Sequence, residues 1–300
     1  MTFGKAIKRF YRKNKKGYLY MTLFLVPYIL FNLVPVVRAI YLSLFNYNII
    51  QPPMFIGLNN YKRLIFDDDI FLLAFKNTIV FALFIGPLGY IMSFYMAWCI
   101  NGLKGRTAYA LAFYAPSITS GIAMTQVWLY IFSNDSHGLI NHFLLRLGMI
   151  NGPILWNQNA EYIYPVVILI SIWMSMGTGF LVFMAGLQNL PQDVLEQGRI
   201  DGIRNRYAEL IYLILPMMKP QLLFGAITAI VGSFGVFDIA AQFAGMPSPN
   251  YAAHTIVAHL YDYAFLRFEM GYASAISVIL FTITFSLGRI CMRVFRTQDE

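Results

Sequence analysis

Long apolar runs alternate with short polar connections along most of the 300-residue chain. Each run reaches the roughly 20 residues that a helix needs to cross a membrane. The short alternating segments that are typical of a transmembrane β-barrel are absent. The pattern therefore predicts an all-α membrane protein with six transmembrane helices, over residues 18–44, 75–100, 108–132, 162–187, 221–243 and 271–294.

Polar and charged residues gather in one connection, residues 191–220, between the fourth and fifth runs. The pattern predicts one short helix over 193–199 and a second over 204–215, in which apolar residues recur at helical spacing. Gly202 lies between them, at a point where a reversing chain needs a residue that tolerates positive φ. We interpret this connection as a rigid docking element and not as a solvated linker.

The composition supports a membrane location for most of the chain. Hydrophobic residues make up 58% of it and charged residues 12%, whereas about 25% of a soluble domain is charged. We therefore predict a transmembrane domain at 18–294, between a basic tail at 1–17 and a short tail at 295–300. The lipid bilayer is accordingly a predicted partner.

The formal net charge of +8 is distributed unevenly between the two predicted faces of the membrane. Basic residues concentrate at 1–17, 104–106, 199–219 and 289–296, which six alternating spans place on one side. Lys and Arg accumulate on the cytoplasmic side of membrane proteins. Both termini and the 191–220 connection are therefore predicted to be cytoplasmic, and the charge is explained without a nucleic-acid partner.

No cofactor or metal site is predicted in this chain. Cys99 and Cys291 lie near predicted cytoplasmic span ends, where thiols remain reduced, and the four histidines are scattered. The chain also lacks the GxxxxGK[ST] pattern that cradles ATP phosphates. We therefore predict that it is not an enzyme.

The 191–220 connection resembles the EAA loop of bacterial ABC importer permeases, which runs from a Glu-Ala-Ala pattern through a glycine to a helix that ends near Leu-Pro. The residues that carry this resemblance are, in order, Glu196, Asp201, Gly202, Leu215, Pro216 and Pro220. This chain has Gln197 and Gly198 in place of the two alanines, and one extra residue between Asp201 and Pro216.

Further matches extend over nearly the whole chain. They resemble segments of the carbohydrate-uptake subfamily, in particular of the first permease subunit of maltose-type importers. The matching segments are 55–65, 114–132, 171–198, 237–249 and 261–277. The resemblance implies a type I ABC importer permease-like fold with six transmembrane helices, in a bacterial cell membrane.

The resemblance also implies partners and a division of labour. A second homologous permease subunit would complete the pathway, two ATPase subunits would bind ATP and Mg, and an extracellular binding protein would deliver the sugar. The residues expected to couple this chain to an ATPase subunit are Glu196, Gln197, Gly198, Asp201, Gly202, Arg204 and Tyr207.

A sugar site is expected inside the bundle, because small-molecule pockets are mostly apolar with a few placed polar groups. Trp173 aligns with a sugar-contacting tryptophan of the maltose-type family, and Gly177 and Gly179 would let the backbone approach closely. Asp238 is a carboxylate near the end of the fifth run, where a charge suggests function. The candidate substrate-binding residues are Ser117, Gly121, Ser171, Trp173, Met174, Ser175, Thr178, Thr228, Gly232 and Asp238. Small residues in membrane helices also serve as packing contacts, and that interpretation stays open for each.

Three other functions stay open. A permease for a sugar phosphate or another polar solute should place Arg or Lys in the cavity, and the predicted spans carry such a residue only near their ends, as at Arg38. A scaffold or sensor that moves no substrate would have no use for a force-transmitting loop. A membrane enzyme would need a catalytic constellation, which the sequence does not show.

Overall fold

The computed structural model describes residues 15–119 and 121–296, and helices form most of this part of the chain. Most of the predicted tails, 1–17 and 295–300, lies outside the described residues. Helices cover the first, second, fifth and sixth predicted spans. They are α2 (Lys15–Tyr28), η1 (Ile29–Leu33), α3 (Val34–Leu42), α5 (Asp69–Asn101), α14 (Lys219–Phe234), α15 (Phe237–Ala244) and α17 (Met270–Arg296).

Among the described residues, four helices are long and apolar enough to cross a membrane. A fifth candidate span consists of α9 (Ala160–Ser175) and α10 (Thr178–Gln188), which are bent by 41° at their junction. The third predicted span, 108–132, is divided between two helices, α6 (Arg106–Ile118) and α7 (Gly121–Ile131). Thr119 is extended, with φ −71° and ψ 141°, and this conformation ends α6.

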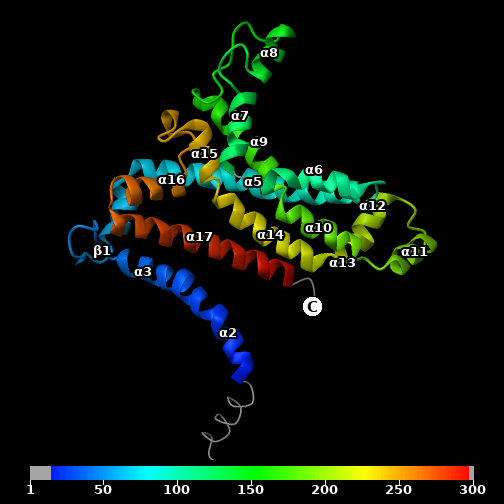
Figure 1. Cartoon of the computed structure of the whole chain (residues 1–300), viewed down its shortest axis with the longest axis horizontal. Helices are drawn as coiled ribbons and strands as arrows, with labels where there is room; N and C mark the ends of the chain where they lie inside the picture. The colour runs from blue at the N-terminus through cyan, green and yellow to red at the C-terminus, as the bar shows by residue number, and fades with distance from the viewer. Residues whose placement is uncertain (1–14, 120, 297–300) are drawn as a thin grey trace, which may run out of the picture.

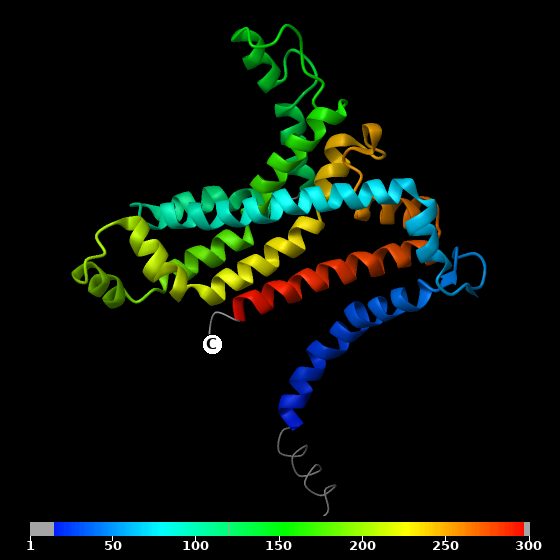
Figure 2. The ribbon, with the colours of Figure 1, turned by 180° about the vertical axis from the view of Figure 1, so that it is seen from behind.

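The long helix α5 is the centre of the fold. It packs against α9, α10 and α14, and α17 packs against α14 and α3. Helices α5, α10, α14 and α17 form an elongated body, from which α7, α8 (Leu139–Arg146) and α9 project as an arm (Figures 1 and 2). On the opposite side α2 diverges from the body, and no residue of the most apolar window of the first span is buried.

The two ends of the body carry the shorter elements. One, here called the loop end, holds α11 (Gln192–Ile200), α12 (Arg206–Glu209), η3 (Leu210–Ile214) and α13 (Leu215–Met217). The other, here called the hairpin end, holds the antiparallel pair β1 (Phe45–Asn46) and β2 (Met54–Phe55), α4 (Asn59–Lys62), η2 (Arg63–Asp67), α16 (Ile256–Tyr261) and η5 (Asp262–Leu266). The short η4 (Pro249–Tyr251) packs against α5 and α9.

The loop end confirms the two short helices and the turn predicted between 191 and 220. Gly202 has a φ of +101°, a conformation that residues with a side chain rarely adopt. Asn205 then caps the second helix, because its side chain accepts a hydrogen bond from the Tyr207 amide. The chain therefore reverses at Gly202 and continues into α14 without a flexible linker.

Three hydrophobic clusters hold the helices together. One lies at the centre of the body, one at the loop end and one at the hairpin end. The central cluster includes Phe81, Ile163 and Phe243. The cluster at the loop end includes Trp98, Phe183 and Met218, and the cluster at the hairpin end includes Leu64, Ile256 and Tyr272.

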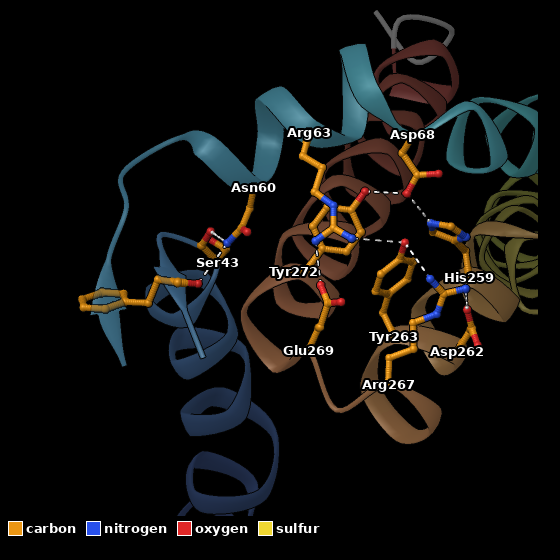
Figure 3. Close-up of polar contacts among 11 residues, drawn as sticks. Ser43, Asn60, Arg63, Asp68, His259, Asp262, Tyr263, Arg267, Glu269 and Tyr272 are labelled. Carbon is orange, nitrogen blue, oxygen red and sulfur yellow. Dashed lines mark hydrogen bonds and ion pairs between the residues drawn. The ribbon is translucent and has the colours of Figure 1, made fainter. Parts of the chain in front are cut away.

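A buried polar network ties the hairpin end together (Figure 3). The Asp68 carboxylate accepts hydrogen bonds from the Phe71 amide at 2.8 Å, from His259 Nε2 at 3.0 Å and from the Tyr272 hydroxyl at 2.6 Å. His254 Nε2 lies 3.2 Å from His259 Nδ1, and burial lowers the pKa of His254 to about 4. The network joins the start of α5 to α16 and α17.

Replacing Asp68 by asparagine should lower the free energy of unfolding by about 3 kcal/mol, because the buried partners lose the charge that they bind. Burial opposes ionisation, but the hydrogen bonds from His259, Tyr272 and Phe71 outweigh it and hold the pKa of Asp68 well below its ordinary value of 3.8. A carboxyl group with a pKa lowered by folding stabilises the folded state above its ordinary pKa and stops doing so as the pH falls.

Denaturant unfolding in detergent, followed from neutral pH to about pH 3, measures this contribution. Wild-type stability should decline below about pH 4, and the decline should be weaker for Asp68→Asn. Equal pH profiles for the two proteins would contradict the assignment.

Candidate functional site

The breaks in two helical segments lie against each other. α6 ends one residue after Ser117, and Gly177 lies between α9 and α10. A Cβ atom added at Gly177 would lie less than 3.0 Å from Ser117 Cβ, a distance that real Cβ atoms essentially never show. Glycine therefore lets the backbone at this break pack directly on Ser117. At Gly179 the corresponding space is open.

A cavity of about 390 Å³ lies beside these breaks, with walls mainly from α5, α9, α10 and α14 and further lining residues from α6 and α15. Its volume is within the range of about 300–1,000 Å³ that is usual for small-molecule sites. The candidate substrate-binding residues that line it are Ser117, Ser171, Met174, Ser175, Thr178, Thr228 and Gly232. The structure thus brings together candidates from the third, fourth and fifth predicted spans.

The second predicted span supplies a cavity wall that sequence reasoning missed. Gly86, Gly89, Tyr90 and Ser93 of α5 line the cavity. A Cβ atom at Gly89 would meet the Ser175 hydroxyl, so α5 approaches α9 closely there. The three small residues recur at spacings of three and four, which places them on one helical face. That spacing is the signal by which this wall could have been found.

The cavity hydroxyls differ in how they are paired. Ser117 and Ser175 donate to carbonyls of their own helices at 2.8 Å, and Thr228 does so at 3.0 Å. Their oxygen lone pairs can then accept hydrogen from a ligand. The Ser171 hydroxyl is buried and has no hydrogen-bond partner among the described residues. Buried polar groups are usually paired, so Ser171 stands apart from the other cavity hydroxyls, and its contact with a ligand stays a prediction.

The cavity walls carry no formal charge. Among the described lining residues there is no Asp, Glu, Lys or Arg, and no group of metal-ligating side chains occurs in the part of the chain that the structure describes. An ion transferred to such walls would lose its hydration without compensation. A neutral molecule with several hydroxyl groups could pair with the serines and threonines, so the cavity suits that class of ligand.

Three candidate residues lie outside the cavity walls. Trp173 is 39% exposed and belongs to an aromatic row, with ring centroids 6.4 Å from Phe113 and 6.3 Å from Trp128. Asp238 is exposed in the first turn of α15, and Gly121 begins α7. Their contact with substrate stays a prediction, although the residue after Trp173 does line the cavity.

The candidate coupling residues lie on the surface of the loop end, with one exception. The exposed members are Glu196, Gln197, Asp201, Gly202, Arg204 and Tyr207. Gly198 is buried, and a Cβ atom there would lie less than 3.0 Å from Leu213 Cδ1, so α11 packs closely on η3. Arg199 Nη2 also lies 3.6 Å from Glu209 Oε1. α11 is therefore held against the following helices, with polar groups facing outward.

Comparison with known proteins identifies relatives along the whole chain. Residues 89–296 match the family described as "Binding-protein-dependent transport system inner membrane component". The "Probable ABC transporter permease protein YesP" of Bacillus subtilis (strain 168) is 31% identical over 293 residues, which are 96% of this chain and 92% of that protein. The "Arabinooligosaccharides transport system permease protein AraP" of the same organism is 28% identical, over 95% of this chain and 90% of that protein.

Two further matches belong to transport systems named for other solutes. The "sn-glycerol-3-phosphate transport system permease protein UgpA" of Yersinia pestis is 30% identical, over 80% of this chain and 79% of that protein. The fold also matches a chain in the crystal structure of a bacterial ABC transporter involved in the import of the acidic polysaccharide alginate. The TM-score is 0.83 at 19% identity, over 97% of this chain and 99% of that chain.

Proposed function

Because this chain belongs to the family of inner-membrane components of binding-protein-dependent transport systems, we propose that it is the membrane-spanning subunit of an ATP-driven importer of a neutral sugar or oligosaccharide. The observation that carries the proposal is the uncharged, hydroxyl-lined cavity beside the two helix breaks. The arabinooligosaccharide permease among the relatives supports the same class of substrate.

The cavity explains how a sugar is held. Sugar hydroxyls donate to the oxygens of Ser117, Ser175 and Thr228, and a sugar oxygen accepts from Ser171, so the buried polar groups of both partners are paired. The fourth span is broken and bent at the same level. Its two halves can change their angle by rotation at the break, as hinges do. Alternating access then consists of opening the cavity first to one side of the membrane and then to the other.

The partners follow from this role. ATP and Mg bind to two ATPase subunits, which dock at the exposed polar groups of the loop end, so this chain hydrolyses nothing. A second homologous permease subunit completes the pathway. A substrate-binding protein delivers the sugar at the hairpin end. The alginate transporter of similar fold has been solved in complex with its alginate-bound periplasmic protein, which supports this arrangement.

The membrane arrangement that we propose has six spans, with α6 and α7 together forming the third. Labelling with a membrane-impermeant thiol reagent tests it through cysteines at the exposed positions Lys104 and Ile200. Both should be labelled only from the cytoplasmic side, because the basic residues flank these positions and accumulate on that side. Labelling of the two positions from opposite sides would refute six alternating spans.

The main alternative is a permease for a sugar phosphate or another anion, as the glycerol-3-phosphate and alginate systems show for related proteins. An anion in the cavity would require cationic partners such as Arg or Lys, and the described cavity walls have none. A scaffold without substrate flux would leave the buried Ser171 hydroxyl without a ligand. Both alternatives are therefore disfavoured.

Uptake by proteoliposomes that contain the assembled transporter and its binding protein distinguishes these functions. Radiolabelled neutral oligosaccharides, sn-glycerol 3-phosphate and alginate oligosaccharides are offered with internal ATP. ATP-dependent accumulation of a neutral sugar alone is the expected result. Accumulation of an anionic substrate would favour the alternative, and ATP hydrolysis without accumulation of any solute would favour a scaffold or sensor.

A further inference from the structure

Arg206 connects the loop end to α5 through two contacts with a single residue, Trp98. The guanidinium Nη2 donates to the Trp98 carbonyl oxygen at 3.1 Å. The Arg206 Cζ atom lies 4.5 Å from the centroid of the Trp98 ring, and the neighbouring Tyr207 ring lies 5.5 Å from the same ring. Trp98 is buried in the hydrophobic cluster of the loop end. Arg206 therefore reaches from the exposed loop to a fixed part of the bundle.

The hydrogen bond satisfies an acceptor that the helix itself leaves unpaired. α5 ends at Asn101, and the last four carbonyls of a helix have no amide partner within it. The Gly102 amide bonds to the Ile100 carbonyl and not to that of Trp98. A cation is also favourable at this end of the helix dipole. Arg206 thus caps α5 from a different segment of the chain.

The geometry depends on arginine and on the glycine opposite it. A planar guanidinium can donate in its plane while its face rests on an aromatic ring, whereas a lysine ammonium has no planar face that can stack on the ring. A Cβ atom at residue 102 would lie 2.8 Å from the Arg206 Nη2 atom. Gly102 therefore leaves the space that the guanidinium occupies.

The two ends of this connection are both well anchored. On the loop side, Gly198 packs on Leu213, so a displacement of α11 moves η3 and α12 with it. On the other side, α5 is one continuous helix whose Gly86, Gly89 and Ser93 line the cavity. Arg206 therefore connects the loop end to the helix that carries this wall of the cavity.

We propose that Arg206 is a positioning residue that transmits movement of the loop end to α5 and so to the cavity wall. The backbone already attaches the loop to α10 and α14, and the Tyr207 ring and the loop-end hydrophobic cluster pack against α5. Arg206 adds a directional, charged contact with the end of that helix. The inference rests on the proposed function, because it assumes that an ATPase subunit moves the loop.

The first test measures the attachment in the purified full chain and does not depend on transport. Spin labels are placed at Leu103 and Ile200 in a cysteine-free background, and their distance distribution is recorded in lipid nanodiscs. Arg206→Ala should broaden the distribution, whereas Lys104→Ala, which removes a cation near the same helix end, should leave it unchanged. An unchanged distribution in Arg206→Ala would overturn the attachment.

The second test measures coupling in proteoliposomes as molecules of sugar imported per ATP hydrolysed. Arg206→Ala should lower this ratio at least about fivefold, since a charge-assisted hydrogen bond and a cation–π contact are lost together. Arg206→Lys should not restore it, and Lys104→Ala should match the wild type. Gly102→Ala should give an intermediate value, because it displaces the guanidinium while Arg206 remains.

The two tests separate this inference from the proposed function. A broadened distance with a wild-type coupling ratio would overturn the role of Arg206 in transmission and leave the importer function intact. If the wild type takes up no sugar, the importer function is overturned, and the role of Arg206 in transmission with it. The distance measurement would still decide whether Arg206 attaches the loop end to α5. If Arg206→Ala fails to assemble with its partners, the ratio of sugar imported to ATP hydrolysed is measured for Gly102→Ala instead. A wild-type ratio in Gly102→Ala would overturn the proposal.

Discussion

Replacing Gly177 by alanine should reduce sugar uptake by about fivefold to a hundredfold, since overpacking by one methyl group typically costs 1–3 kcal/mol and 1.4 kcal/mol corresponds to a factor of ten. The added Cβ would lie less than 3.0 Å from Ser117 Cβ. The backbone of α6 fixes the position of Ser117 Cβ, so no change of side-chain rotamer can move this atom away. Alanine at residue 177 therefore pushes apart the two breaks that frame the cavity. Uptake by proteoliposomes at equal amounts of inserted protein measures the effect.

A second substitution provides a sharp control for this prediction. Ser117→Gly removes the atom that the new methyl group would meet, so the double variant Gly177→Ala with Ser117→Gly should take up more sugar than Gly177→Ala. Its uptake should approach that of Ser117→Gly alone, which lacks the sugar-binding hydroxyl. Gly288→Ala adds a methyl group to a span where nothing lies within 4 Å of it, and it should retain wild-type uptake. Equal loss in the single and double variants would show that the contact between the breaks is not the cause.

Replacing Gly202 by valine should abolish transport while the protein still inserts in the membrane. The φ of +101° at Gly202 is one that a β-branched residue does not adopt without strain, at roughly 1 kcal/mol or more. Nothing lies within 4 Å of the Cβ position there, so the effect arises from the backbone alone. The turn between α11 and α12 would change shape, and the surface offered to an ATPase subunit would change with it.

Co-purification of the ATPase with the permease is the direct measurement. Gly202→Val should lose the ATPase, and Gly202→Asn should retain more of it, because asparagine tolerates positive φ better than valine. Gly152→Val serves as the matched control, since it adds the same side chain where nothing lies within 4 Å of the Cβ position and where φ is not positive. Normal transport by Gly202→Val with its ATPase bound would remove the loop end from the coupling mechanism.

Most of the helical segments and the turn at Gly202 were predictable because they depend on local properties. An apolar run of sufficient length forms a helix in lipid whatever lies beside it, since every backbone polar group must be paired there. A glycine between two short helical patterns predicts a reversal for steric reasons. The break within the third run has a local signal, because Pro116, Ser117, Thr119 and Gly121 lie close together there and disfavour a continuous helix. That signal does not say whether the chain only kinks or, as observed, ends one helix at an extended Thr119.

The candidate site was predicted in part, and the reason lies in helix rotation. Ser171 and Ser175 were chosen by resemblance, and both line the cavity. Trp173 lies between them in the sequence, yet its ring packs in the aromatic row. Residues one or two positions apart on a helix point in different directions. Sequence proximity to a cavity residue therefore does not place a side chain in the cavity.

The sequence alone determined the class of protein, the location of its apolar helices and the position of its polar loop. These features follow from hydrophobicity and backbone sterics that act over a few residues. Only the tertiary structure decided which helical faces meet, as at Gly177 and Ser117, and that Arg206 binds the carbonyl of Trp98, 108 residues away in the chain. Such contacts depend on how each helix is rotated and where it ends against its neighbours, and no local pattern encodes either quantity.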